Sequence, residues 1–589
     1  METVKPTRRT RPLWQFRLRS LAFVILVAAM GCGWWAYHHG QIRDRRIAHS
    51  GIIRRQAELT KLPESWILRP LEGETKSLPW WLRFAAERDA HVTTEVSFDL
   101  RTYDDGFEES TDIHDEDLAL VARFSELQSL KVPRCQVTDE GLRHLAPLIN
   151  LRHLDLSGNA ITDAGLRHLR PLKSLETLVL DNVQLEGSGL EHLAACPRLR
   201  SLTLRVPTLA NAQAINQIPA LEELVIDSRS LAKIDLQLMT ALRTISLNLG
   251  APDVGVCLSR LPQLERATIS LNTKEGGQGV RMLNLPRLDT LCLHLTSPDQ
   301  CTASALFLKD LSALRTVEIV ADVPDDAMME QLAAITSIQR LSMAGDRLVF
   351  GDQDADKLTA LTHVRDLHLA NTCLTDAGMR RLSDLKSLQR LTVRSELLTD
   401  RGVQELAMLP ELNWLHLIGA RGTADLGPAI SMLTKLETLL LENCRFPRLT
   451  MAGGGNDSSR RFFVRLRQLT LRECEIDGVW VDGLAGLQEL SLEAATAKSF
   501  HIIDLVDLRR LDISLHAAQE VTAFEMAGLP KLVWLSMQCG AQGARVPAET
   551  FDHLDELKSL QGGIIWGLQM PDNAREQLDK FKQAMGLRL

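Results

Sequence analysis

Residues 151–169 read LRHLDLSGNAITDAGLRHL, and this short stretch contains two different periodicities. Leu154 and Leu156 alternate with polar residues, which predicts a short strand with one buried face. Asn159 follows at the point where the chain must turn, and its amide can satisfy backbone groups there. Thr162–Asp163 then offers a helix start before the next leucines. The stretch therefore predicts a strand, a turn and a short helix.

The L-x-x-L-x-L pattern of this stretch recurs along most of the chain, with aliphatic substitutions. One unit cannot bury its own apolar face, so stacked units must supply the core. We expect about 19 units at a mean step of about 24 residues. They begin at Leu127, Leu151, Leu175, Leu199, Leu221, Leu242, Leu264, Leu288, Leu314, Ile338, Val364, Leu388, Leu412, Leu436, Leu466, Leu487, Leu508, Leu532 and Leu557.

Composition and charge narrow the class of protein further. The chain has 589 residues, of which 45% are hydrophobic and 24% charged, and this excludes a disordered chain. The formal net charge of −8 does not indicate a nucleic-acid-binding protein. Residues 1–61 contain 12 Lys and Arg against 3 Asp and Glu, a balance of +9, so the remaining residues carry −17.

Within this basic region, Leu21–Tyr37 has no charged residue and ends in aromatic residues. Such a segment predicts a transmembrane helix at 21–37, between a basic tail at 1–20 and a juxtamembrane connector at 38–90. A cleaved signal peptide is the main alternative, but bulky and basic residues follow the apolar run. Basic residues are nearly balanced across the segment, and a long C-terminal domain is translocated largely regardless of charge. We therefore expect a single-pass membrane protein with extracytoplasmic repeats.

The repeat consensus L-x-x-L-x-L-x-x-N/C-x-I/L-T-D-x-G-L resembles the leucine-rich repeat family, in its cysteine-containing subtype, over 127–560. The basic leader and Gly-Trp-Trp end of the apolar segment resemble, more loosely, those of membrane-anchored bacterial leucine-rich repeat proteins. The resemblance implies an α/β leucine-rich repeat solenoid with a parallel concave β-sheet and short convex helices. Units within 205–350 vary in length and mostly lack Thr-Asp, so we expect an irregular convex side there.

The two ends of such an array need caps, because its terminal faces are apolar. We expect an N-terminal capping unit at 91–126, built from an alternating strand and a helix that starts at Asp115. We expect a C-terminal cap at 561–589, with an amphipathic helix that starts at Asn573. The glycine-rich residues 451–459 lengthen one unit and predict a mobile loop.

No catalytic, cofactor or metal motif is recognisable, so we expect neither an enzyme nor a cofactor. The chain has 10 Cys without a C-x-x-C pair. Cys135, Cys444 and Cys474 occupy the position of Asn159 in their units, which favours a buried ladder over a reactive thiol, whereas Cys373 is one residue off. His144, His168 and His192 recur with the repeat, but successive convex helices are too far apart for one zinc ion.

The exposed columns of the predicted concave sheet contain the candidate partner-binding residues. One region combines an aromatic residue with Arg and His, a composition typical of binding hot spots. The alternative is that the tryptophans only cover the strand surface. The candidates are Asp366, His368, Arg390, Arg394, Trp414 and His416, with a weaker cluster of Arg510, Asp512 and Trp534.

The favoured function is a membrane-tethered, non-catalytic leucine-rich repeat protein that binds a protein or an extended polymer through its concave face. We expect membrane association through Leu21–Tyr37 and no binding of nucleic acid. Two alternatives remain open, a structural spacer of the cell envelope and a regulatory or recruiting subunit that faces the cytoplasm. The sequence leaves the ligand and the oligomeric state undetermined.

Overall fold

The structure is a computed structural model of the chain. It describes residues 95–97 and 111–585, except 232, 252–253, 273–278, 297–305, 322–325, 346–349, 454–462, 464, 494–495, 516–519 and 540–542. The expected basic tail, transmembrane helix and connector lie outside the described residues. Among those that are described, no helix is both long and apolar enough to span a bilayer. The chain divides into two compact units, Met1–Thr203 and Leu204–Leu589.

In the first unit, one short strand of each repeat joins a parallel sheet. These strands are β1 (Glu95–Ser97), β3 (Ser129–Lys131), β5 (His153–Asp155) and β6 (Thr177–Asp181). A second parallel pair consists of β2 (Thr111–His114) and β4 (Cys135–Gln136). The helices are α3 (Asp115–Val121), α4 (Asp139–Leu142) and the 3-10 helices Arg143–Leu145, Gly165–Leu169 and Ser188–Ala195. β7 (Ser201–Arg205) contains the border between the units.

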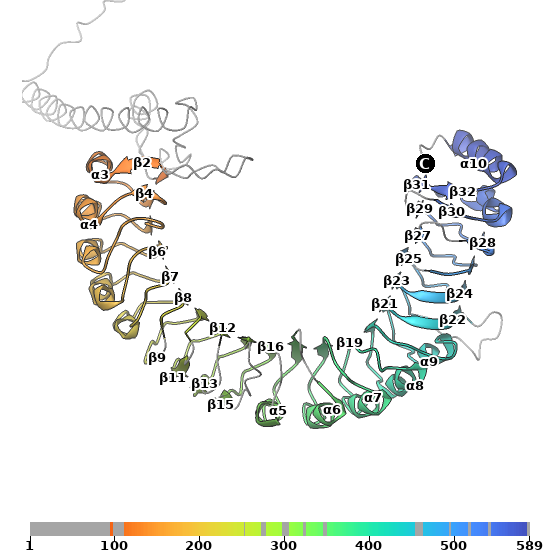
Figure 1. Ribbon diagram of the computed structural model, residues 1–589, viewed down its shortest axis with the longest axis horizontal. Helices are drawn as coiled ribbons and strands as arrows, with labels where there is room; N and C mark the ends of the chain where they lie inside the picture. The colour runs from red at the N-terminus through yellow and green to blue at the C-terminus, as the bar shows by residue number, and fades with distance from the viewer. Residues whose placement is uncertain are drawn as a thin grey trace, which may run out of the picture. The chain divides into compact units, whose positions relative to one another are not determined.

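In the second unit a long parallel sheet lines the inner side of a curve, and Figure 1 shows helices and further strands on the outer side. We call the exposed side of this long sheet the inner face. Its strands are β8 (Glu223–Ser228), β10 (Thr244–Leu249), β12 (Arg266–Asn272), β14 (Thr290–Thr296), β16 (Thr316–Ala321), β17 (Arg340–Ala344), β18 (Asp366–Leu369), β19 (Arg390–Arg394), β20 (Trp414–Ile418), β21 (Thr438–Glu442), β23 (Gln468–Arg472), β25 (Glu489–Glu493), β27 (Arg510–Leu515), β29 (Trp534–Cys539) and β31 (Gly562–Trp566).

The outer side of the second unit carries helices in its middle and at its C-terminal end. They are the 3-10 helix Gln213–Gln217, α5 (Asp326–Ala333), α6 (Asp352–Leu358), α7 (Asp376–Leu382), α8 (Asp400–Glu405), the 3-10 helix Leu406–Met408, α9 (Gly427–Ser431), the 3-10 helices Ala548–Phe551 and Leu554–Glu556, and α10 (Asp572–Met585). The last of these begins one residue before the predicted Asn573.

Two stretches of the outer side form parallel sheets instead of helices. One contains β9 (Lys233–Gln237), β11 (Gly255–Ser259), β13 (Gly279–Leu283) and β15 (Leu306–Lys309). The other contains β22 (Arg445–Ala452), β24 (Glu475–Asp482), β26 (Ser499–Ile503) and β28 (Ala523–Ala527), and β30 (Ala544–Arg545) pairs with β32 (Leu568–Gln569).

These outer sheets correct two expectations. The prediction of an irregular outer side within 205–350 was wrong, because alternating apolar residues such as Ile234 and Leu236 are buried and pair in register with the next unit. The prediction of a loop over 451–459 was wrong at its start, because Met451 and Ala452 end strand β22. Most of the remaining stretch lies outside the described residues.

The leucines of the consensus form the core. Leu151, Leu154, Leu156, Leu166 and Leu169 are each at most 1% exposed. Full burial of such a side chain contributes about 1.5–3 kcal/mol relative to exposure. Since the same positions are buried in unit after unit, stacking provides the core that a single repeat lacks.

In several repeats an Asn or a Cys side chain holds the turn after the strand. The amide of Asn159 donates to the carbonyls of Val132 (2.6 Å) and Leu156 (2.9 Å), and its oxygen accepts the N–H of Val137 at 3.2 Å. At the equivalent position the Cys444 thiol donates to the Leu417 carbonyl. The preceding Asn443 has a φ of 51°, the left-handed conformation that an asparagine tolerates well. The predicted ladder is confirmed at these positions.

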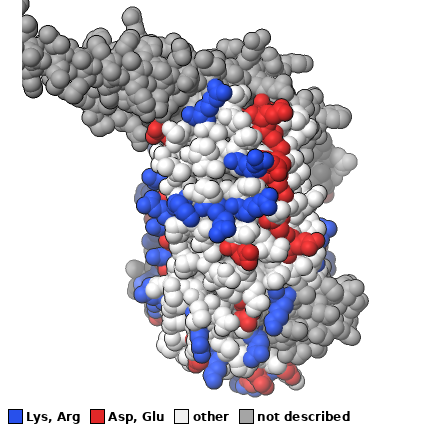
Figure 2. Space-filling model, turned by 90° about the vertical axis from the view of Figure 1, so that its left-hand side faces the viewer, with Lys and Arg blue, Asp and Glu red and all other residues white. Residues whose placement is uncertain are grey.

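The Thr-Asp pairs do more than start a helix. Thr375 accepts a hydrogen bond from the Ala377 N–H at the start of α7, as a helix cap does. Asp376 accepts the N–H (2.9 Å) and the hydroxyl (2.7 Å) of Thr399 in the next repeat. The same pair of contacts joins Thr138 to Asp115, Thr162 to Asp139 and Thr375 to Asp352, and we call this series the aspartate ladder. In the first unit, Figure 2 shows acidic side chains in a column on the outer side.

The aspartate ladder explains why the consensus T-D-x-G requires a glycine, because no side chain fits there. A Cβ atom on Gly402 would lie 2.4 Å from Oδ1 of Asp376, and one on Gly378 would lie 2.3 Å from Oδ1 of Asp352. The aspartate of one repeat therefore occupies the space that a side chain in the next repeat would need. This contact couples the two most regular positions of the outer consensus.

Candidate binding surface

Most of the predicted binding residues lie at the beginning of three neighbouring strands. β18, β19 and β20 pair in parallel, with Asp366, Arg390 and Trp414 side by side. His368 and His416 lie two residues further along β18 and β20. Side chains two residues apart lie on the same side of a strand, and the intervening leucines are buried. All five side chains therefore belong to the inner face.

The Asp366 carboxylate lies between two arginines. Its Oδ2 is 3.2 Å from Nε of Arg340 and 3.7 Å from Nη1 of Arg390. Both arginine side chains are 60% exposed, so each ion pair contributes at most about 1 kcal/mol. The carboxylate uses few of the five N–H donors that each guanidinium offers. It orients the two arginines and leaves donors for a partner.

Trp414 provides an apolar surface beside Arg390. Its ring is half-buried and contacts the His416 ring edge-on, with the ring centroids 5.8 Å apart and the planes at 85°. Thr438 and Arg390 are its neighbours on the adjoining strands. A half-buried indole next to an exposed arginine is a common composition of interface hot spots.

The two histidines contribute no positive charge at neutral pH. Burial lowers the pKa of His368 below its ordinary value of 6.5. Burial also lowers the pKa of His416, against the opposing effect of the Glu442 carboxylate, whose Oε2 accepts a hydrogen bond from Nε2 of His416 at 3.2 Å. The positive charge of this region therefore comes from arginine alone.

Arg394 lies apart from the other predicted residues. It ends β19 and pairs in register with Ile418, whereas Arg390 begins the same strand. Four residues of a strand span about 13 Å. The structure thus brings Asp366, Arg390 and Trp414 together and leaves Arg394 near the opposite edge of the inner face.

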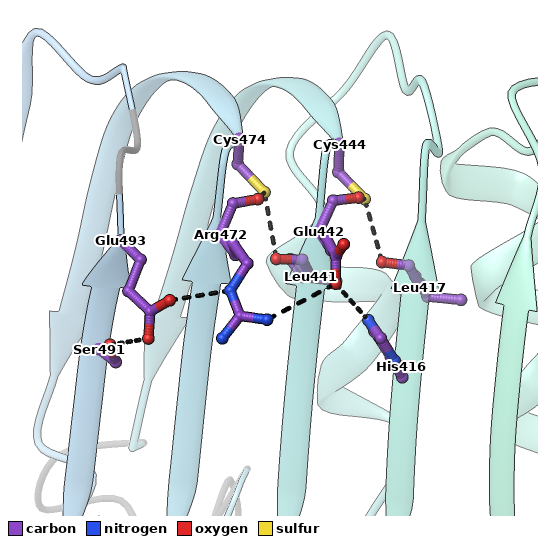
Figure 3. Close-up of polar contacts among 9 residues, drawn as sticks. All are labelled: His416, Leu417, Leu441, Glu442, Cys444, Arg472, Cys474, Ser491 and Glu493. Atoms are coloured by element: carbon purple, nitrogen blue, oxygen red, sulfur yellow. Dashed lines mark hydrogen bonds and ion pairs between the residues drawn. The ribbon is translucent and has the colours of Figure 1, made fainter. Parts of the chain in front are cut away.

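A charged network that the sequence analysis missed continues from His416 across the next strands. Glu442 on β21 accepts from His416, and its Oε2 lies 4.0 Å from Nη1 of Arg472 on β23. Nε of Arg472 donates to Oε2 of Glu493 on β25 at 2.8 Å, and Ser491 donates to the same carboxylate at 3.0 Å (Figure 3). The hydrogen bond from Arg472 lowers the pKa of Glu493. Glu442, Arg472 and Glu493 share the column of Arg394, so the same column, continued further, would have placed these three residues side by side.

In the weaker predicted cluster, Arg510 and Asp512 pair with each other, whereas the buried Nε1 of Trp534 has no hydrogen-bond partner among the described residues. Arg510 forms an ion pair with Asp512 and lies over the Trp534 ring, with Cζ 5.9 Å from the ring centroid. Trp534 covers Gly562 on the adjoining strand, where a Cβ atom would lie 3.1 Å from the indole. Trp534 thus covers strand surface, which is the alternative that the sequence left open for it.

A cavity of about 360 Å³ opens at the edge of the inner face where β16 to β19 begin. We call it the edge pocket. Each repeat along it contributes one arginine, either in the residue before the strand or in its first residue. The charged lining consists of Arg315, Arg340, Arg365 and Arg390 with Asp289 and Asp366.

The cysteines of the ladder are buried in the turns that follow the inner strands. The Cys444 and Cys474 thiols are buried and donate to the carbonyls of Leu417 and Leu441 at 3.4 and 3.3 Å (Figure 3). Outside the ladder, at the end of the 3-10 helix Ser188–Ala195, burial raises the pKa of Cys196 to about 11, so this thiol is protonated at neutral pH. Cys373, one residue off the ladder, is exposed.

The histidines that recur with the repeat lie on successive outer 3-10 helices of the first unit. His144 is in Arg143–Leu145, His168 in Gly165–Leu169 and His192 in Ser188–Ala195. Over the described ranges, no group of three or more His, Cys, Asp or Glu side chains is placed to hold a metal ion.

Comparisons with known proteins bear on the repeats. A family model described as a leucine-rich repeat matches residues 148–169 and 360–383. No curated protein sequence matches the chain. Among solved structures, the chain is similar to an internalin from Listeria monocytogenes, with 16% identity, coverage of 65% of this chain and 82% of that one, and a TM-score of 0.26.

Two further structures are also similar. One is a leucine-rich repeat protein from Leptospira interrogans, with 13% identity, coverage of 80% and 92%, and a TM-score of 0.38. The other is the functional domain of InlJ from Listeria monocytogenes, which includes a cysteine ladder, with 16% identity, coverage of 73% and 76%, and a TM-score of 0.33.

The two matched segments each contain one complete unit of the structure. Residues 148–169 include β5 and the helix Gly165–Leu169, and residues 360–383 include β18 and α7. The strand, the turn and the short outer helix occur in both in the same order. From these matches and the stacked units, we conclude that the chain contains leucine-rich repeats.

Proposed function

We propose that this protein binds a protein partner, without catalysis, through the inner face of its second unit. The observation that carries the proposal is the row of Asp366, Arg390 and Trp414 on adjoining strands. This row combines an apolar anchor with exposed, oriented guanidinium groups. A long sheet that presents one side chain row per repeat suits an extended partner better than a small metabolite.

We further propose that the chain is tethered to a membrane through Leu21–Tyr37, with the repeats outside the cytoplasm. The apolar composition of this segment and the basic residues around it support the tether. Protease added to intact cells should digest the repeats under this topology. Protection of the repeats until the membrane is opened would instead place them in the cytoplasm.

Affinity capture with the full-length protein in detergent tests the binding proposal. The test variant combines Trp414→Ala with Arg390→Ala. The control variant combines Met408→Ala with Arg401→Ala, which removes one exposed apolar side chain and one exposed arginine from the outer side of one repeat. We expect the test variant to lose the captured partner and the control to retain it.

A structural spacer of the envelope is the competing function. A spacer predicts that no substitution on the inner face changes capture or phenotype, whereas removal of residues 1–37 does. Equal capture by wild type, test variant and control would therefore contradict specific binding at Trp414.

A further inference from the structure

The edge pocket is positively charged in a protein that is otherwise acidic. Its charged lining has four arginines against two aspartates. The chain as a whole carries −8, and the part beyond residue 61 carries −17 because residues 1–61 carry +9. The net negative charge of the molecule therefore repels an anion. Any affinity for an anion must arise from the local arrangement of charges.

The arginines of the edge pocket retain unused donors. Arg315 lies 3.9 Å from Asp289, at the outer limit of an ion pair, and Arg340 and Arg390 share Asp366. Arg365 has no acidic partner within the described part of the chain. Two carboxylates cannot occupy the donors of four guanidinium groups, each of which presents five N–H bonds.

The backbone under the edge pocket is hydrogen-bonded between successive repeats. The carbonyl of Arg315 accepts the N–H groups of both Gln339 and Arg340, at 2.8 and 2.9 Å. The carbonyl of Arg365 accepts those of Gln389 and Arg390, both at 2.8 Å. These paired hydrogen bonds recur from repeat to repeat and fix the backbone positions of the arginines. Binding of a ligand therefore costs less conformational entropy.

The surroundings distinguish a peptide from a uniform polyanion. Trp414 adjoins Arg390 on the next strand and offers an apolar contact beside the charges. Glu318 on β16 lies two strands from Asp366 in the long sheet, and Glu442 and Glu493 carry negative charge further along it. A polyanion that followed the inner face would meet these carboxylates. A ligand with a few carboxylates next to an apolar side chain would not.

We propose that the edge pocket binds carboxylate groups of an acidic protein segment, one of whose apolar side chains covers Trp414. The inference rests on the proposed function, since it names the chemistry of the partner at that surface. The guanidinium groups donate to the carboxylates in charge-assisted hydrogen bonds, and arginine suits this role because its donors match a carboxylate in pairs.

Fluorescence anisotropy with a defined probe tests the proposal on the full-length protein. The probe is a labelled 12-residue peptide of alternating Glu and Leu, and its control has Gln in place of Glu. We expect the Glu peptide to bind, the Gln peptide to bind at least ~10-fold more weakly, and binding of the Glu peptide to weaken as salt is raised. Equal binding of both peptides would overturn the proposal.

Charge reversal locates the site. Arg365→Glu with Arg390→Glu should weaken the Glu peptide at least ~10-fold, and the same pair changed to Gln should have a smaller effect. Arg467→Glu with Arg509→Glu is the matched control, because these exposed arginines hold the same strand-preceding position as Arg365 outside the edge pocket. Equal losses in both reversed pairs would overturn the assignment to this pocket.

Heparin, a sulfated polysaccharide, is the competing ligand. If heparin bound through Arg365 and Arg390 while the Glu peptide did not, the pocket would be a polyanion site and the proposal would be wrong. Loss of peptide binding only with Trp414→Ala would also overturn the role of the edge pocket. The proposed function would still be tested separately, by the capture of a protein partner.

Discussion

Replacement of Asp376 by alanine removes one contact of the aspartate ladder and is expected to loosen two neighbouring repeats. The carboxylate accepts the N–H and the hydroxyl of Thr399 at 2.9 and 2.7 Å. A hydrogen bond to a charged group contributes about 1.5–3 kcal/mol, and a buried donor left unpaired costs about 1–3 kcal/mol. Because this site is only part-buried, we expect the free energy of local opening to fall by about 2–4 kcal/mol.

Amide hydrogen exchange over α7 and α8 measures this loss directly. A decrease of about 2–4 kcal/mol corresponds to exchange about 30 to 1,000 times faster in the segment that opens. Asp384→Ala is the matched control, since Asp384 is exposed in the loop after α7. Unchanged exchange at Thr399 in Asp376→Ala, or equal acceleration in the control, would refute the role of the ladder as a contact between repeats.

Three further substitutions test the account. Gly402→Ala should destabilise the protein because its Cβ would lie 2.4 Å from Oδ1 of Asp376, and a double-mutant cycle should show a smaller cost in the Asp376→Ala background; additive costs would exclude this clash. Asn159→Ala should lower the free energy of unfolding in urea by about 2–4 kcal/mol, because buried backbone groups lose their partners, and Asn159→Cys should cost less. Equal costs would contradict the ladder. Burial lowers the pKa of His368 below 6.5, so on acidification the unfolded state binds this proton at a higher pH than the folded state, and the protein loses stability. The free energy of unfolding of His368→Gln should therefore fall less between pH 7 and 5 than that of the wild type. An identical shift of the urea midpoint in both proteins would contradict this.

The repeat unit could be predicted because its signals are local. Leu154 and Leu156 alternate, Asn159 follows at the turn, and Thr162 lies three residues before the helix Gly165–Leu169, all within one short stretch. The contact from Thr162 to Asp139 was not predicted, although both residues belong to recognised pairs. A side chain that reaches the neighbouring repeat leaves no local pattern, and only the glycine two residues after Asp139 and Asp376 hints at it.

The outer sheets and the details of the site were missed for different reasons. Lys233–Gln237 alternates around Ile234 and Leu236, so a signal for a strand was present, but the absence of Thr-Asp was interpreted as irregularity. The columns of the inner face predicted that Asp366 and Arg390 are neighbours. The network through Arg472 depends on the conformations that its long side chain and those of its neighbours adopt. The sequence does not specify these conformations.

Crosslinking in cells tests the central claim, that a protein partner docks on the inner face at Trp414. A photo-reactive residue replaces Thr438, which adjoins Trp414 on β21, and in a separate variant it replaces Arg401, which is exposed on α8. We expect a discrete protein adduct from position 438 that disappears when Trp414 is also changed to alanine, and none from position 401. Adducts from position 401 with none from position 438 would contradict binding at the inner face.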